Sequence, residues 1–260
     1  MDSIYLSFMT ELAVGSGDVI RPFFGEHSTA VEQKADASPV TEADRAAELW
    51  LRRQIERRYP EHGILGEEFG TVRGDAEWVW VLDPVDGTKS FVLGVPLFTT
   101  LIGLLHRGQP VLGCIHQPIL NQLLLGDTKT TTLNGRPVRV RADRPMSEAS
   151  MLTCDPMNPG RYKNGSRFDD LANRVGVYRT FGDGYGYLLV ASGWADMMVD
   201  PIMNPWDLLP LVPVIQGAGG VITDWEGAPI AGASTNSCVA ATPGLHAEII
   251  GILNGRNLPG

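Results

Sequence analysis

The run Trp78-Val79-Trp80-Val81 and the ten residues after it constrain the fold more than any other stretch. The run is short, apolar and rich in aromatic and β-branched residues, which predicts a strand buried on both faces of a sheet. Two acids, Asp83 and Asp86, stand where this strand should end, and α/β sheets place their chemistry at such ends. Pro84 fixes its own φ and favours an extended predecessor, so a bend there would turn both carboxylates toward one point.

Two carboxylates held close together repel each other unless a cation joins them. Gly87 and Thr88 follow directly and supply a flexible backbone whose N–H groups can approach an anion, with a hydroxyl beside them. The stretch is therefore suited to a hard cation and to a phosphate. From these residues alone the alternative is an Asx-turn that ends a strand, because Asp, Pro and Gly are ordinary turn residues.

Composition limits the classes of protein to consider. The 260 residues, 43% of them hydrophobic, can bury a substantial core as one large α/β domain or as two lobes. No apolar stretch is long enough to span a bilayer and the acidic N-terminus is the reverse of a signal peptide, so we expect a cytoplasmic protein without a membrane partner. The net charge of −9 argues against nucleic acid as a partner. Widely spaced cysteines suit reduced thiols better than disulfides or a zinc site.

Hydrophobic spacing predicts the elements of the first half of the chain. We expect a helix over 3–24, a loop or edge hairpin over 32–40, a helix capped by Thr41 that ends at Pro60, and a strand over 63–66. A meander of strands should follow over 97–125, and Asn134-Gly135 marks a hairpin. This half should therefore contain helices and a largely antiparallel sheet.

The second half alternates short strands with helices. The strands are expected over 151–154, 178–181, 195–199, 220–224 and 238–241, and the helices over 168–175, 185–192, 208–220 and 246–253. Pro213 should kink the helix that opens at Leu208. We therefore expect an N-terminal lobe over 1–145, with helices on a mainly antiparallel sheet, and a C-terminal α/β lobe over 146–260.

Three further acids stand where an expected element begins or ends. Asp44 and Asp207 lie in the first turns of helices, and Glu67 follows the strand over 63–66. Each has an ordinary role, because acids at helix N-termini interact favourably with the helix dipole and Glu67-Glu68 suits a solvated turn. A role in metal binding requires that these acids converge with Asp83 and Asp86 in the folded chain.

Three motifs in series resemble those of the inositol monophosphatase family, whose members are magnesium-dependent, lithium-sensitive phosphatases. They are Gly66-Glu67-Glu68, then Asp83-Pro84-Val85-Asp86-Gly87-Thr88, then Trp206-Asp207 followed by Gly217-Ala218-Gly219-Gly220. The order and spacing match from the first expected helix to the last, and a series is far more specific than one motif. The resemblance implies a layered αβαβα sandwich of α/β (α+β) class, a homodimer, and an active site between the two lobes.

The resemblance also implies a set of metal ligands. Glu67, Asp83 and the carbonyl of Val85 would hold a first Mg²⁺, and Asp83, Asp86 and Asp207 a second, with about two to three ions per site. Ionised carboxylates beside a divalent cation stay charged, so several acids can share one cleft. Inhibition by Li⁺ is expected.

Catalytic and phosphate-binding roles follow from the same resemblance. A metal-bound water would attack phosphorus in line, activated by Asp44 and Thr88 with Glu67, and no phosphoenzyme would form. Backbone N–H groups of Gly87 and Thr88 would hold phosphate oxygens. The substrate is then a small phosphate ester.

The sequence departs from the inositol type at Lys89-Ser90, where that type usually has Thr-Asn. With the segments 96–102, His116-Gln117-Pro118 and 211–215, the chain looks most like the histidinol-phosphate phosphatase branch of the family. Such an enzyme would release histidinol in histidine biosynthesis.

Four residues are candidates for contact with the substrate. Asp183 and Asp200 match positions that contact the alcohol in relatives and would suit a cationic alcohol, and Lys89 and Asn204 complete the set. The ordinary alternative for both acids is a turn or strand end, and Lys89 can screen the phosphate or pair with a carboxylate. The alternative functions are a broader phosphatase acting on inositol phosphate, fructose bisphosphate or a phosphoadenosine nucleotide, and a non-catalytic metal or phosphate sensor on the same fold.

Overall fold

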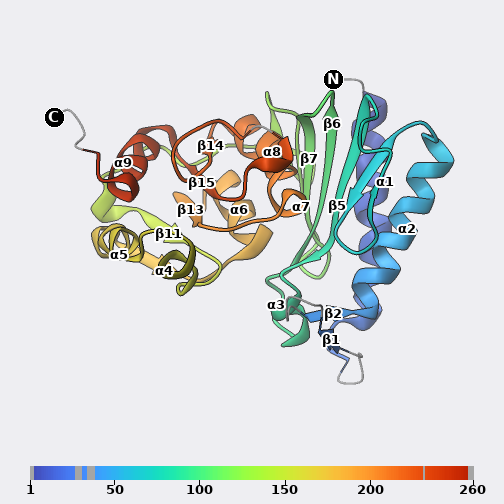
Figure 1. Cartoon of the computed structure of the whole chain (residues 1–260), viewed down its shortest axis with the longest axis horizontal. Helices are drawn as coiled ribbons and strands as arrows, with labels where there is room; N and C mark the ends of the chain where they lie inside the picture. Colours follow the sequence, from blue (N-terminus) through green and yellow to red (C-terminus); the bar gives the residue numbers. More distant parts are fainter. Residues whose placement is uncertain (1–2, 27–30, 34–38, 231, 257–260) are drawn as a thin grey trace.

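Helices and sheets alternate in five layers (Figure 1). The structure is a computed structural model that describes residues 3–26, 31–33, 39–230 and 232–256. Two sheets enclose one layer of helices, and further helices cover the outer face of each sheet. This arrangement confirms the predicted αβαβα sandwich.

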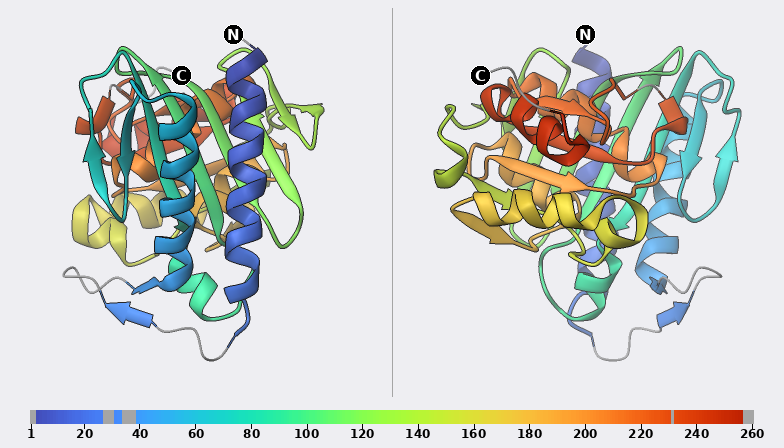
Figure 2. Two further views of the ribbon diagram at one scale, coloured as in Figure 1. Left: turned by 90° about the vertical axis from the view of Figure 1, so that its right-hand side faces the viewer. Right: turned by 60° about the vertical axis from the view of Figure 1, so that its left-hand side comes forward.

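Two long helices cover the outer face of the first sheet. They are α1 (Ser3–Ile20) and α2 (Glu42–Arg58), which lie side by side across the strands (Figure 2). The first helix ends before the predicted residue 24, because a short 3₁₀ helix (Arg21–Phe23) takes over. Thr41 caps α2 as predicted: its hydroxyl accepts the Ala43 N–H, and its own N–H donates to the Asp44 carboxylate.

The first sheet has eight strands in the order β10-β9-β8-β7-β6-β5-β3-β4. All neighbours are antiparallel except β3 and β5, which are parallel, so the expected mainly antiparallel sheet is confirmed. The strands are β3 (Gly63–Gly66), β4 (Gly70–Val72), β5 (Trp78–Asp86), β6 (Thr99–His106), β7 (Gln109–Gln117), β8 (Gln122–Gly126), β9 (Thr131–Leu133) and β10 (Arg136–Val138).

A separate antiparallel pair, β1 (Val31–Gln33) and β2 (Pro39–Thr41), precedes α2 where a loop or edge hairpin is expected. The middle of that predicted segment, 34–38, lies outside the described residues. After β5 the chain turns into the short helix α3 (Thr88–Val92).

Strand β5 is buried on both faces, as predicted. Trp80 and Leu82 pack with α1 and α2, whereas Val79 and Val81 pack with the helices between the two sheets. Successive side chains of a strand point to opposite faces, so Asp83 shares the face of Val79 and Val81. The acid at the end of this strand is therefore directed into the space between the sheets.

The second sheet and the remaining helices complete the layers. This sheet has the order β12-β11-β13-β15-β14, in which β11 is parallel to β12 and β13 and β15 is antiparallel to its neighbours. Its strands are β11 (Ser150–Leu152), β12 (Val177–Arg179), β13 (Met197–Asp200), β14 (Val221–Thr223) and β15 (Cys238–Ala241). The middle layer contains α6 (Asp183–Ala191), α7 (Pro205–Leu208) and α8 (Leu211–Gly217), and the outer layer α4 (Asn158–Tyr162), α5 (Gly165–Arg174) and α9 (Pro243–Asn254).

The helix expected over 208–220 is two helices, with an interruption one turn before Pro213. The break lies at Leu209-Pro210, between α7 and α8. Pro213 is the third residue of α8, and it has no N–H to donate to the carbonyl of Leu209 four residues before it, which accounts for an interruption at this point. None of the described helices is both long and apolar enough to cross a membrane.

Candidate active site

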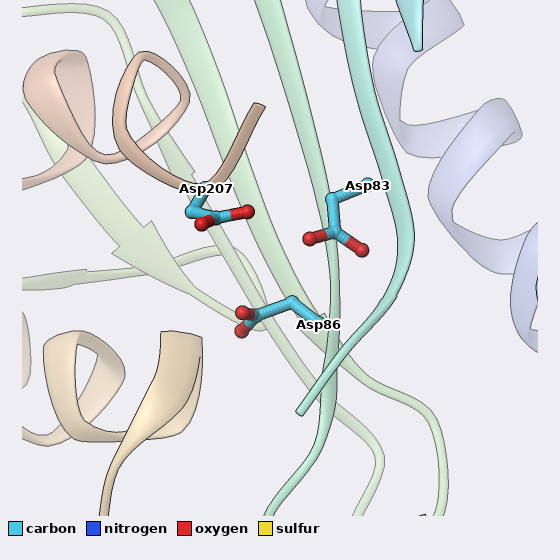
Figure 3. Close-up of side chains that lie close together, drawn as sticks. All are labelled: Asp83, Asp86 and Asp207. Carbon is cyan, nitrogen blue, oxygen red and sulfur yellow. The ribbon is translucent and has the colours of Figure 1, made fainter. Parts of the chain in front are cut away.

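Three carboxylates from distant parts of the sequence meet between the first sheet and the middle helices. Asp83 and Asp86 come from the end of β5 and Asp207 from α7, and their side chains point toward one another (Figure 3). One oxygen of each lies within 4.8 Å of one oxygen of each of the others. The structure thus brings together three of the acids that the sequence singled out.

A β-bulge places Asp83 and Asp86 on the same face. Asp83 pairs with Leu101 on β6 and Asp86 pairs with Thr99, so three steps along β5 match two along β6. In a regular strand, residues three apart point to opposite faces, and the extra residue of a bulge reverses this. The Thr99 hydroxyl then donates to Oδ2 of Asp86 over 3.0 Å.

Asp207 combines its ordinary role with its place in the cluster. The N–H of Asn204 donates to Oδ2 of Asp207 over 2.9 Å, which forms the capping box of α7. This bond fixes the carboxylate at the start of the helix, where it faces β5. The side chain of Asn204 itself is exposed.

Burial and mutual repulsion raise the pKa of the clustered acids. Burial, followed by the negative charges of Glu67 and Asp86, raises the pKa of Asp83 well above its ordinary value. Burial, followed by Asp183 and Asp207, does the same for Asp86. Burial, with a smaller effect of Glu67, raises the pKa of Asp207 to about 7, against the lowering effect of the Asn204 N–H. A cation among them would relieve this cost.

The donor set suits a hard divalent cation. Oδ1 of Asp83 is buried and has no hydrogen-bond partner among the described residues. An unsatisfied carboxylate oxygen in the interior is costly, and a metal ligand is a physical reason for it. The other donors are carboxylate oxygens, which Mg²⁺ prefers. The residues present therefore fit a divalent metal ion.

Glu67 and Asp44 extend the site toward α2. The negative charge of Glu67 is, after burial, the largest cause that raises the pKa of Asp83, so its carboxylate belongs to the same site. Asp44 is buried, and its pKa is raised by burial first and by the charge of Glu67 to a smaller extent. The Thr88 hydroxyl lies 3.3 Å from Oδ1 of Asp44 and 3.0 Å from the carbonyl oxygen of Val85, so it can give its proton to either.

The segment Gly182-Asp183-Gly184, at the start of α6, bounds the site on the side of the middle helices. The N–H of Gly184 donates to Oδ2 of Asp86, and a side chain at 184 would lie 2.3 Å from the Thr99 hydroxyl. Asp183 has a φ of +54°, and its N–H donates to Sγ of Cys154 over 3.0 Å. Oδ2 of Asp183 lies 2.9 Å from where a Cβ on Gly87 would stand. Asp183 is therefore an anion beside the turn predicted to bind phosphate.

Of the other predicted substrate contacts, Asp200 is buried and Lys89 is exposed at the surface. Asp200 is 2% exposed, and its carboxylate accepts hydrogen bonds from Thr153, the Cys154 N–H and the Tyr187 hydroxyl. Because both of its oxygens are occupied inside the protein, this structure does not place Asp200 as a substrate contact. Lys89 is exposed, and its charge lowers the pKa of Asp183, which burial and Asp200 raise to about 6.

The sequence interpretation missed residues that hold the acids in place. Thr99 and Gly184 could not be found, because their role depends on the register of two strands and on the packing of α6. Glu48 did leave a signal, since it lies one helical turn after Asp44 on the same side of α2.

The fold and the cluster together define a carboxylate site suited to a metal ion, set between the two sheets of an αβαβα sandwich. The model of the inositol monophosphatase family matches residues 2–257 of the chain. The chain therefore belongs to the inositol monophosphatase family. It is a phosphatase of a metal-dependent family.

Relatives and solved structures agree with this assignment. The bifunctional phosphatase IMPL2, chloroplastic, of Arabidopsis thaliana is 43% identical, over 89% of this chain and 67% of its own length. A histidinol-phosphatase of Chlorobaculum parvum is 37% identical, over 85% of this chain and 86% of its own. The structure of an inositol monophosphatase from Zymomonas mobilis has a TM-score of 0.84 and 36% identity, covering 94% of this chain and 95% of its own.

Proposed function

We propose that the chain is a magnesium-dependent phosphate monoester hydrolase that converts L-histidinol phosphate to L-histidinol and phosphate. The observation that carries the choice of substrate is the position of Asp183, an anion at the start of α6 that lies beside Gly87. An alcohol that bears an ammonium group would be attracted there, whereas neutral inositol would not. The similarity to a histidinol-phosphatase supports the same choice.

In this proposal Glu67, Asp83, the Val85 carbonyl, Asp86 and Asp207 hold the metal, with about two to three Mg²⁺ ions per site. When bound, these ions would supply charge stabilisation for the phosphoryl group and a lowered pKa for water. Oδ2 of Asp86 already accepts hydrogen bonds from the Gly184 N–H and the Thr99 hydroxyl, so its other oxygen is the one available to bind a metal ion. The bulge and the capping box hold these oxygens in place before any ligand binds.

The remaining residues of the chain position the phosphate and move a proton. The hydroxyl of Thr88 lies between Asp44 and the Val85 carbonyl, so it can pass a proton from the attacking water to Asp44. Burial raises the pKa of Asp44, which makes it a stronger base. The N–H groups of Gly87 and Thr88 hold the phosphate, and Lys89 stands near it at the surface.

The test is phosphate release from L-histidinol phosphate, inositol 1-phosphate, fructose 1,6-bisphosphate and 3′-phosphoadenosine 5′-phosphate, each with Mg²⁺ and with EDTA. We expect kcat/KM for histidinol phosphate to exceed the others at least about a hundredfold, or ~2.7 kcal/mol, and to be lost in EDTA. Similar rates on several esters would indicate a broader monophosphatase, and no release from any would indicate a sensor. Asp86→Asn is the inactive control.

A substitution of Asp183 tests the choice of substrate separately from the hydrolysis step. Asp183→Asn should raise KM for histidinol phosphate about tenfold and leave KM for inositol 1-phosphate nearly unchanged, because only the first substrate carries an ammonium group. Equal effects on both substrates would contradict the role given to Asp183. Inhibition by Li⁺, a homodimeric state and a cytoplasmic location are further parts of the proposal and remain predictions.

A further inference from the structure

A buried carboxylate lies directly behind the turn that carries Glu67. Glu48 projects from α2 and is fully buried. Its Oε2 accepts the N–H of Glu68 over 2.7 Å, and its Oε1 accepts the N–H of Phe69 over 3.2 Å. Two consecutive backbone N–H groups after Glu67 are therefore held by one acid.

Arg52 completes this contact from the next turn of α2. Its Nε donates to Oε1 of Glu48 over 2.8 Å, and its Nη2 donates to the carbonyl oxygen of Gly70. Arg52 is only 7% exposed. The pair thus holds the turn by both kinds of backbone group, since the carboxylate accepts N–H groups and the guanidinium donates to a carbonyl.

The backbone before Glu67 is equally constrained. A Cβ on Gly66 would lie 2.1 Å from Oε1 of Glu48, so the strand approaches the carboxylate more closely than any side chain would allow. On the other side, the N–H of Glu67 donates to the carbonyl of Leu82 over 3.2 Å, one residue before Asp83. Glu67 is therefore fixed between α2 and the strand that carries the metal cluster.

Stability alone is a weak explanation for this arrangement. Burying an acid and an arginine removes both from water, and a well-packed apolar pair in their place is often no less stable. Partners behind metal ligands, by contrast, commonly orient the ligand, and their loss weakens metal binding about 10- to 100-fold. The contacts of Glu48 end on the backbone next to Glu67.

We infer that Glu48, with Arg52, is a positioning residue that holds Glu67 in the geometry required for metal binding. The inference rests on the proposed function, because it assumes that the acidic cluster binds a divalent ion. Among the described residues, the hydrogen bonds of the Glu48 carboxylate join it to Arg52, Glu68 and Phe69, and none joins it to the acidic cluster or to the predicted phosphate turn. Its effect on the metal is therefore exerted through the backbone of the turn.

The test is Mn²⁺ binding by calorimetry to the full chain carrying Glu48→Gln, at a temperature where melting curves show it folded. The amide has only one acceptor oxygen for donors that now use two, so one backbone N–H meets an NH₂ group. We expect the Kd for Mn²⁺ to rise at least about tenfold, with kcat at saturating metal within about threefold of wild type.

A matched control is a similar buried network in the second sheet, just before β13 and away from the acidic cluster. Asp196 is fully buried and accepts bonds from Arg141 at 3.1 Å and from the Ser150 N–H at 2.7 Å. Asp196→Asn should lower the melting temperature and leave the Kd for Mn²⁺ unchanged. If Glu48→Gln binds Mn²⁺ like wild type, or if Asp196→Asn weakens binding as much, the inference is wrong and the proposed function stands.

A second variant covers the case in which Glu48→Gln does not fold. Arg52→Lys keeps the charge beside Glu48 and loses the contact with Gly70. We expect a rise in the Kd for Mn²⁺ of about threefold or more, and an unchanged Kd would overturn the inference. If wild type itself binds no Mn²⁺ while remaining folded, the metal-dependent function fails and the inference falls with it.

Discussion

Removing the charge of Asp207 should stabilise the metal-free protein while it abolishes metal binding. The pKa of Asp207 is about 7 in the folded chain, against an ordinary value of 3.8, mainly because the group is buried. An acid with a raised pKa holds its proton in the folded state after the unfolded state has lost it. Stability contributed by this group is therefore lost as pH rises from about 4 to about 7.

The size of the effect follows from the difference of roughly three in pKa. At 1.36 kcal/mol for each, the difference corresponds to about 4 kcal/mol. Asp207 is half-buried, so solvent screening reduces the expected contribution to roughly 2 kcal/mol. Asn at this position can still accept the Asn204 N–H and keep the helix cap.

The assay is urea denaturation of wild type and Asp207→Asn in EDTA at pH 5 and pH 8. We expect the variant to be more stable than wild type by roughly 2 kcal/mol at pH 8 and by less than half of that at pH 5, where the unfolded carboxyl has already lost its proton but the folded one has not. The difference is the relevant quantity, because groups that Asp207 does not influence cancel in it. The charge of Asp207 also raises the pKa of Asp83 and Asp86, so its removal favours the variant at high pH in the same direction. Saturating Mg²⁺ should then stabilise wild type only. A difference that does not change with pH, or a variant less stable at both pH values, would refute the reasoning.

Three further predictions follow from individual contacts. Thr88→Val removes the hydroxyl between Asp44 and the Val85 carbonyl, so kcat should fall about 10²- to 10³-fold with little change in KM, and a wild-type kcat would exclude the proton relay. Gly184→Ala brings a methyl to 2.3 Å from the Thr99 hydroxyl and 2.6 Å from Oδ2 of Asp86, so metal affinity should fall at least about tenfold, measured as the Mg²⁺ dependence of activity; an unchanged dependence would count against it. His116 is 2% exposed, and burial, with a smaller effect of Arg21, lowers its pKa to about 4. Its contribution to stability is therefore lost as pH falls from about 6.5 to about 4, and urea denaturation of His116→Gln should show roughly 3 kcal/mol less of this loss; equal losses would contradict the neutral buried imidazole.

The secondary structure and the identity of the main acids could be predicted because they depend on local chemistry. An apolar run rich in β-branched and aromatic residues predicts β5, and Thr41 with Asp44 predicts the start of α2. The two acids that flank Pro84 could be identified as candidates for the same reason. Pro213 likewise indicated an interruption of the helix, which lies one turn before it at Leu209-Pro210.

Local patterns in the sequence therefore predict most of the elements and the acids that could bind a cation, and the series of family motifs predicts the layered class. How these acids are held is visible only in the folded chain, where the bulge opposite Thr99 puts Asp83 and Asp86 on one face and Glu48 accepts the N–H groups of the turn after Glu67. The folded chain also shows that the carboxylate of Asp200 accepts hydrogen bonds from the Cys154 N–H and the Tyr187 hydroxyl, although Asp200 and Asp183 were equal candidates for contact with the substrate. The physical reason is that hydrogen-bond partners far apart in the sequence are chosen by strand register and helix packing, and neither is encoded in a local pattern.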